Sequence, residues 1–267
     1  MAKAKKASKK GKLTKHLIQW YGWVPDVPDQ RDKMYSAPAR VLKAMPPSVD
    51  LRPNCPPVYD QGQLGSCTAN AIAGALEFDQ MKQGEASFTP SRLFIYYNER
   101  DMEHTVNEDS GAMIRDGVKS VATLGAPPEI ADWPYDISQF KIKPPVKAYT
   151  DALKYQAVLY QRLTQQIDQL KGCLASGFPF VFGMSVYESF ESQAVAKTGK
   201  VPMPKPAEKS LGGHAILAVG YNDSQKRFTV RNSWGPDWGL AGYFTIPYAY
   251  LLNTNLTDDF WTIKLVK

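Results

Sequence analysis

The chain has 267 residues, 43% of them apolar, which suits one large folded domain or two small ones packed together and excludes a wholly disordered protein. Its apolar stretch at residues 177–186 is far shorter than the roughly 18 residues that cross a bilayer, so the sequence also excludes a transmembrane protein. The net charge of +6 comes from residues 1–15, which hold seven lysines and no acid, because the remainder has 25 basic and 26 acidic residues.

Residues 1–15 are predicted to be a disordered, solvated tail, because Lys, Ala, Ser and Gly cannot bury a core. A patch for nucleic acid or an anionic membrane is the alternative. No secretory signal is visible, since the basic start lacks the apolar stretch of about 7–15 residues that such a signal needs. The cytoplasm is therefore the default expectation, and export by another route is left open.

Residues 16–47 are predicted to form an extended N-terminal arm. The segment W-Y-G-W-V-P-D-V-P-D-Q-R-D carries three aromatic residues, Trp20, Tyr21 and Trp23, and two Pro-Asp steps, with neither a helical nor an alternating period. Proline restricts its own φ and favours extended geometry in the residue before it. Because aromatic side chains add stability only where they are buried, we expect the arm to lie on a surface of the folded body.

The body, residues 48–267, changes from a helical to a strand-like pattern along the chain. Helices are predicted at residues 67–83, 89–99, just before Gly125 and within 151–177, and strands at 178–186, 214–221, 227–233, 242–246 and 260–266. This order predicts an α+β fold with two lobes, mainly helical over residues 60–150 and mainly β over residues 151–267.

The chain has three cysteines, Cys55, Cys67 and Cys173, and three histidines, none at the spacing of a metal site. We therefore expect no metal and no cofactor. An odd number of cysteines leaves at least one free thiol. If that thiol is Cys67, then Cys55 and Cys173 are the only pair that could form a disulfide, and the sequence leaves open whether they do.

A Gly-rich turn, Q-G-Q-L-G-S, delivers Cys67 to the start of a predicted helix. The unpaired N–H groups and partial positive charge of a helix N-terminus favour a thiolate. On its own, the segment fits a buried core cysteine equally well. His214 opens a predicted strand, and Asn232, eighteen residues later, closes the next one. A hairpin would bring both residues to one edge of the sheet, where an asparagine can orient an imidazole.

Four segments together resemble the papain family of cysteine peptidases, and the overall pattern is most similar to bacterial members. They are V-D-L-R from Val49, Q-G-x-x-G-S-C ending at Cys67, G-H-A-I-x-A-V-G-Y around His214 and N-S-W-G-x-x-W-G from Asn232. The separation of 147 residues between Cys67 and His214 lies within the roughly 130–150 typical of this family. The resemblance covers residues 48–267 and implies a papain-like fold of two lobes, a helical left lobe and a β-barrel-like right lobe, with the active site in the cleft between them.

The resemblance implies a role for each matching residue. Cys67 would be the nucleophile, His214 the base and acid, and Asn232 the residue that orients His214, while Gln61 would donate to the oxyanion beside the Cys67 N–H. A free thiol has a pKa of about 8.5 and a papain-type cysteine one of about 3–4. Lowering the pKa by about five units takes roughly 7 kcal/mol, whereas a helix terminus contributes at most about 2 kcal/mol. His214 would therefore supply most of the shift, as the cation of a resting ion pair.

Three further residues match substrate-side positions of this family. Gly111 would leave room for the substrate backbone, Trp234 would cover the His–Asn pair, and Trp238 would line the primed side of the cleft. Two positions depart from the family pattern: Leu64 stands where the family usually has a disulfide-forming cysteine, and Thr68 where it usually has Trp or Tyr. Neither position performs chemistry, so we expect activity to be kept and the packing behind the helix to differ.

The sequence thus predicts a cysteine endopeptidase that acts on peptides or proteins as a monomer. An acyl transferase would use the same residues with an amine as acceptor, and a binding module could keep the fold without activity. A nucleic-acid binder ranks last, because the body has no basic patch with interleaved aromatics.

The arm has a counterpart in the family, whose members resemble one another in being made as inhibited precursors, usually with a far longer helical pro-segment. We therefore expect the arm to lie along or beside the cleft and to restrict substrate access. Packing on the back of a lobe is the alternative.

Overall fold

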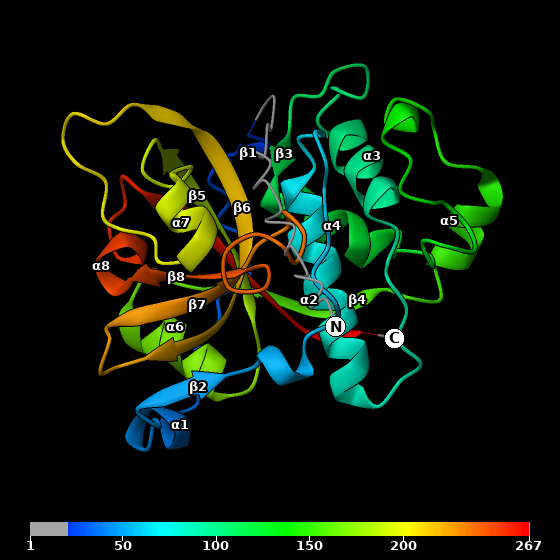
Figure 1. The fold of residues 1–267 in the computed structure, drawn as a ribbon. Helices are drawn as coiled ribbons and strands as arrows, with labels where there is room; N and C mark the ends of the chain where they lie inside the picture. The colour runs from blue at the N-terminus through cyan, green and yellow to red at the C-terminus, as the bar shows by residue number, and fades with distance from the viewer. Residues whose placement is uncertain (1–20, 267) are drawn as a thin grey trace, which may run out of the picture.

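The computed structural model describes residues 21–266 (Figure 1). The lysine-rich tail and Trp20, with the interpretations made for them above, lie outside the described residues. Within residues 21–266, no helix is both long and apolar enough to cross a membrane. This part of the chain is an α+β structure, and Figure 1 shows α3, α4 and α5 on one side of α2 and β5, β6, β7 and β8 on the other.

One antiparallel sheet forms the β-rich half. Its strands follow the spatial order β4-β9-β5-β6-β7-β8, and β2 pairs with β6 outside this path, so the described strands form an open sheet. They span Ser48–Asp50 (β2), Ala157–Arg162 (β4), Phe180–Tyr187 (β5), Ser210–Asn222 (β6), Arg227–Arg231 (β7), Tyr243–Pro247 (β8) and Thr257–Val266 (β9). Residues 214–221 of β6 are all buried, which explains why this strand reads as a continuous apolar run.

Helix α2 lies at the centre of the molecule, against β6, β9 and β5 on one side and against α3 and α4 on the other. Its residues 67–80 are all buried, and its many alanines allow neighbours to approach closely on every side. The described α-helices are Ala39–Lys43 (α1), Cys67–Gln83 (α2), Arg92–Met102 (α3), Ile114–Thr123 (α4), Val146–Ala152 (α5), Ile167–Ala175 (α6), Gln193–Thr198 (α7) and Tyr248–Leu251 (α8). Short 3₁₀ helices occupy Arg52–Asn54 and Ile137–Gln139.

The helix predicted within residues 151–177 is confirmed as α6, and the structure adds a strand before it that the sequence pattern did not predict. The structure ends α5 at Ala152, forms β4 over Ala157–Arg162 and only then begins α6 at Ile167. β4 is an edge strand that pairs with β9, at the far end of the chain, and its Val158 and Leu159 are exposed. A short apolar run of this kind fits a helix or a strand, and the long-range pairing with β9 decides between them.

The arm follows two successive surfaces. Trp23–Val24 (β1) pairs in parallel with Ala112–Met113 (β3), and Figure 1 shows β1 between β6 and β3. Further on, Met34 bridges Arg162 of β4, and α1, which follows Pro38, packs against α6. The first described residues of the arm, at β1, therefore lie between β6 and β3 (Figure 1). The later residues of the arm pack along β4 and α6. Helix α1 lies among them, although the sequence predicted that the arm is extended throughout.

Asp79 of α2 is expected to make the stability of the protein depend on pH. Its carboxyl is buried, neither oxygen has a hydrogen-bond partner among the described residues, and burial raises its pKa to about 8. Since an unfolded Asp has a pKa of about 3.9, the folded state binds more protons between about pH 4 and pH 8, and stability falls as the pH rises through this window.

Asp79→Asn removes this titration. We expect the substitution to raise Tm by about 5 °C at pH 8 and to change it little at pH 5, where the carboxyl is protonated in the folded state. Thermal melts at the two pH values check the prediction. Equal shifts at both would contradict it.

Candidate active site

Cys67 lies where helix α2 meets strand β6. It is the first residue of α2, its side chain is fully buried, and its Sγ accepts a hydrogen bond at 3.3 Å from the backbone N–H of Ala215, 148 residues along the chain. Ala215 directly follows His214 on β6. The fold therefore brings the thiol of Cys67 to the strand position next to His214, at the seam between the helices and the sheet.

Asn232, just after β7, holds the imidazole of His214. Nε2 of His214 and Oδ1 of Asn232 are 2.8 Å apart. Oδ1 also accepts the backbone N–H of Ser233 at 2.9 Å, so this oxygen is an acceptor and Nε2 carries the proton. Nδ1 is then the nitrogen that can take up and release a proton. The indole of Trp234 stacks on the imidazole, with 5.2 Å between ring centroids and 27° between planes, and covers the pair.

Gln61 lies beside this pair, in the turn before α2. Its Oε1 accepts from the Ser233 hydroxyl at 2.5 Å, and its Nε2 donates to the Leu64 carbonyl at 2.9 Å, which fixes the orientation of the amide. An amide nitrogen has two N–H groups, so Nε2 can donate one more hydrogen bond. Sequence reasoning missed Ser233 as the residue that orients Gln61. It stands inside the N-S-W-G segment, but only the fold pairs it with a residue 172 positions away.

The first described residues of the arm lie against this site. The backbone N–H of Gly22 is directed at Sγ of Cys67, and the Gly22 carbonyl accepts from the N–H of Ala112 at 2.8 Å. Gly111 has a positive φ of 74°, and a Cβ placed there would overlap the backbone of Gly22. A Cβ on Gly22 would in turn overlap the carbonyl oxygen of Gly65. The two glycines allow backbone to lie against backbone at the site.

Tyr21 covers the site from the other side. Its ring lies edge-on to His214 at 5.9 Å between centroids, and its hydroxyl donates to Glu191. Trp238 is 7% exposed and packs against Trp234 and Phe190. In this state Trp238 supports the indole over the imidazole, and the residue expected to line a groove is almost fully enclosed.

Burial of Cys67 acts against the resting ion pair expected from the sequence. Burial raises the pKa of the Cys67 thiol to about 12, although the backbone N–H groups of Ala215 and Gly22 partly offset this effect. In the described structure, burial therefore favours the protonated thiol. The ion pair is an expectation for a state in which the arm has left and water reaches the sulfur.

Thr68 replaces aromatic packing behind α2 with a hydrogen bond. Its hydroxyl donates at 2.5 Å to Glu99 of α3, a fully buried carboxyl whose pKa burial raises well above its usual range. Leu64, at the other departure from the family pattern, is buried. The helix that carries Cys67 is thus tied to α3 by a polar contact.

No metal or disulfide supports the site in the part of the chain that the structure describes. Among residues 21–266, no group of three or more His, Cys, Asp or Glu side chains is arranged to hold a metal ion. Cys55, Cys67 and Cys173 are all free thiols, so the possible disulfide between Cys55 and Cys173 is not formed.

Comparison with known proteins identifies the family. A family model of papain family cysteine proteases matches residues 45–257. The chain belongs to this family. The protease is 45% identical over 278 residues to an uncharacterized peptidase C1-like protein of Acanthamoeba polyphaga mimivirus, with 95% of this chain and 89% of the relative covered.

Solved structures agree with this assignment. The protease is similar to xylellain, a cysteine protease from Xylella fastidiosa, with 46% identity, a TM-score of 0.87, and 96% of this chain and 100% of the other covered. ProCathepsin B from Trypanosoma congolense has a TM-score of 0.74 at 18% identity, covering 93% of this chain and 87% of the other, and supports the fold alone. The papain-like fold and the cysteine protease class predicted from the sequence are confirmed.

Proposed function

We propose that this protease hydrolyses internal peptide bonds with Cys67 as nucleophile and His214 as the group that transfers protons, while Asn232 orients His214 and Gln61 stabilises the oxyanion. The convergence of these residues supports the proposal best. Sγ of Cys67 lies 3.3 Å from the N–H of Ala215, next to His214, whose Nε2 bonds Asn232 at 2.8 Å.

The proposed reaction begins once the arm has left the cleft. Nδ1 of His214 takes the proton of Cys67, and the thiolate attacks the peptide carbonyl carbon. The N–H of Cys67 and Nε2 of Gln61 stabilise the oxyanion, and His214 then protonates the leaving amine. Water, deprotonated by His214, hydrolyses the thioester, which releases the acid and restores the thiol. Because Asn232 holds the Nε2 proton, both transfers occur at Nδ1.

Gln61→Ala tests the oxyanion assignment. We expect the variant to stay folded and its kcat to fall by about 10²–10³-fold. The lost N–H is a preorganised donor to the carbonyl oxygen on which negative charge develops in the transition state. The matched control is Gln63→Ala, which truncates an exposed glutamine in the same turn and should leave kcat unchanged. Steady-state kinetics on one peptide substrate compare the two variants. A Gln61→Ala enzyme that turns over as fast as Gln63→Ala would remove Gln61 from the mechanism.

We further propose that the arm inhibits the protease by occupying the cleft. At Cys67 the arm presents the N–H of Gly22, while the Gly22 carbonyl is held by Ala112. The group that the arm directs at the sulfur is thus an N–H and not a carbonyl carbon, which favours blocking of the site without cleavage of the arm there. The raised pKa of the buried Cys67 thiol acts in the same direction, since a protonated thiol is a poor nucleophile.

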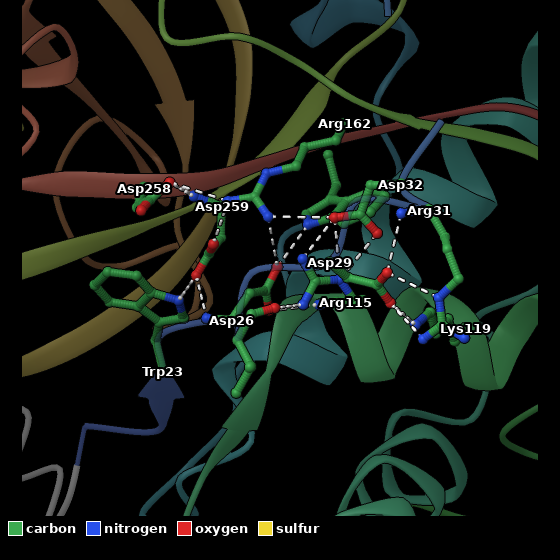
Figure 2. Close-up of polar contacts among 12 residues, drawn as sticks. Trp23, Asp26, Asp29, Arg31, Asp32, Arg115, Lys119, Arg162, Asp258 and Asp259 are labelled. Carbon is green, nitrogen blue, oxygen red and sulfur yellow. Dashed lines mark hydrogen bonds and ion pairs between the residues drawn. The ribbon is translucent and has the colours of Figure 1, made fainter. Parts of the chain in front are cut away.

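Charged side chains fasten the arm to the body, as Figure 2 shows. The carboxylate of Asp26 accepts from the backbone N–H of Arg115 and from the indole N–H of Trp261, each at 2.9 Å. Asp32 and Arg115 form an ion pair at 2.5 Å with both side chains almost fully buried, and Arg162 lies 3.4 Å from Asp32. Removing one partner of such a buried pair is costly, so these contacts favour one docked position.

The proposed activity is tested with the full chain and a fluorogenic dipeptide amide. We expect fluorophore release, and we expect an epoxide reagent that alkylates papain-type thiols to react at Cys67. Mass analysis of the products in the presence of an added amine separates hydrolysis, which yields the free acid, from acyl transfer, which yields the new amide. The same assays are repeated with Gly22→Ala, in which the arm cannot dock. If this variant also neither releases the fluorophore nor reacts at Cys67, the protein is a binding module.

A further inference from the structure

The two proposed oxyanion donors stand on separate segments of the chain. Nε2 of Gln61 belongs to the turn before α2, and the backbone N–H of Cys67 belongs to the first residue of that helix. The turn between them contains Gly62, which has a positive φ of 64°, and Gly65. Because glycine restrains the backbone least of all residues, the turn by itself does not fix the position of Gln61 relative to Cys67. Contacts from outside the turn have to hold it.

The guanidinium of Arg92, the first residue of α3, holds one side of this turn. Its Nη1 donates at 3.0 Å to the backbone carbonyl of Asp60 and at 3.0 Å to Oδ1 of Asn70, in the first turn of α2. Its Nε and Nη2 donate to the two carboxylate oxygens of Glu129 at 2.9 and 2.8 Å, and both side chains of this pair are largely buried. The paired contact fixes the plane of the guanidinium. Arg92 therefore ties the residue before Gln61 to α2 and α3.

Tyr135 holds the backbone carbonyl of Gln61 itself. Its hydroxyl donates to that carbonyl at 3.0 Å, and its ring centroid lies 3.9 Å from the guanidinium carbon of Arg92. Since the one hydroxyl proton of Tyr135 is used in this bond, the Ser66 hydroxyl is the donor in the 2.5 Å contact between the two hydroxyls. Oγ of Ser66 in turn accepts from Nδ2 of Asn70 at 3.1 Å.

These contacts form one chain of hydrogen bonds that ends on the turn. Its members, in order, are Arg92, Asn70, Ser66, Tyr135 and the carbonyl of Gln61. Every donor in this chain has an acceptor, and such a network polarises and rigidifies its members. Ser66 directly precedes Cys67, so the chain connects the two segments that carry the proposed oxyanion donors.

We propose that Arg92 and Tyr135 are positioning residues of this protease that hold the backbone of Gln61 in its catalytic place. Nε2 of Gln61 is thereby kept directed at the same oxygen as the N–H of Cys67. The inference rests on the proposed role of Gln61 as an oxyanion donor. Such a donor acts only when it is preorganised where charge develops, and a displacement of about 1 Å can cost about 10²-fold in rate. The contacts of the Gln61 amide set its rotation, whereas those of Arg92 and Tyr135 set the position of its backbone.

Tyr135→Phe in the full chain removes one hydroxyl and tests the inference through two rates. The first is the hydrolysis of a fluorogenic peptide amide, in which negative charge develops on the carbonyl oxygen. The second is the alkylation of Cys67 by iodoacetamide, in which the sulfur attacks a saturated carbon and no oxyanion forms. We expect kcat to fall by about tenfold, while KM and the alkylation rate each stay within about twofold. A docked arm lowers kcat/KM and the alkylation rate by the same factor, so their ratio does not depend on it.

Tyr149→Phe is the matched control for the loss of a hydroxyl. Tyr149 is half-buried in α5, and its hydroxyl donates at 2.9 Å to Asn98 of α3, so the substitution also removes one side-chain hydrogen bond. Because neither residue bonds the turn that carries Gln61, we expect the ratio of kcat/KM to the alkylation rate to stay as it is in the unaltered chain.

Arg92→Lys examines the other half of the network. Lysine keeps the positive charge beside Glu129 but lacks the planar set of donors that reaches three acceptors at once, so the ratio should fall by about tenfold or more. The matched control is Arg52→Lys. The guanidinium of Arg52 pairs with Asp50 at 2.7 Å on the surface, and its replacement should leave the ratio unchanged.

A double substitution shows which residue Tyr135 acts through. If it acts through Gln61, Tyr135→Phe should slow an enzyme that already carries Gln61→Ala by less than about twofold, although it slows the unaltered chain about tenfold. A structural role for Tyr135 would slow both enzymes alike.

Each outcome decides a separate point. Equal ratios in Tyr135→Phe and Tyr149→Phe, or equal losses with and without Gln61→Ala, would overturn the positioning role while leaving the proposed chemistry intact. If Gln61→Ala turns over as fast as Gln63→Ala, the proposed oxyanion donor fails and the inference fails with it. If Arg92→Lys does not fold, Tyr135→Phe and the double variant decide.

Discussion

Cys67→Ala and His214→Ala are each expected to lower kcat/KM by about 10⁴- to 10⁶-fold, which is the largest effect that a single substitution should have on this protein. The first removes the atom that attacks the substrate, and the second removes the proton carrier without which the buried thiol stays protonated. The two losses should not add in the double variant, because both residues act in one step. Steady-state kinetics with a fluorogenic peptide measure all three.

Cys55→Ala is the matched control for the loss of a thiol. Cys55 is half-buried, and its thiol contacts the Leu51 carbonyl and the Tyr243 hydroxyl, neither of which belongs to the proposed catalytic group, so its removal should leave kcat/KM within about twofold. Substantial activity in Cys67→Ala would contradict the nucleophile assignment. Equal losses in Cys55→Ala and Cys67→Ala would point to a structural effect of the thiols.

Gly22→Ala is expected to have the second largest effect, an increase in activity. The added Cβ would overlap the carbonyl oxygen of Gly65, so the arm cannot keep its backbone against Cys67. Overlap with a backbone atom is not relieved by a rotamer change and should cost more than the roughly 1.4 kcal/mol that changes a docking equilibrium tenfold. We therefore expect kcat/KM and the rate of Cys67 labelling to rise by about tenfold or more, and Tm to fall as the arm loses contacts.

The control for the arm is Val27→Ala. Val27 is 65% exposed, and its carbonyl, which accepts from Arg115, is unaffected by truncation of the side chain. This variant should match the unaltered chain in kcat/KM and in Cys67 labelling. If Gly22→Ala lowers Tm but leaves both rates unchanged, the arm is a structural element and the inhibitory role is wrong.

Local pattern was sufficient to predict several features from the sequence alone. The bounds of α2, residues 67–83, follow from a Gly-rich turn before Cys67 and a left-handed Gly84 after Gln83, both encoded within a few residues. The strands β5 to β9 were predicted within a few residues of their ends, since buried β-branched and aromatic runs between turn residues are also local signals. The segments around Cys67, His214 and Asn232 led to the papain family, which the comparisons confirm.

Only the tertiary structure decided the features that depend on distant partners. β4 is a strand because it pairs with β9, and burial in the folded chain raises the pKa of the Cys67 thiol. The indole N–H of Trp23 donates to the carboxylate of Asp259, 236 positions further along the chain. No local period specifies such a contact, because desolvation and pairing arise only when the chain has folded and the neighbours of each side chain are in place.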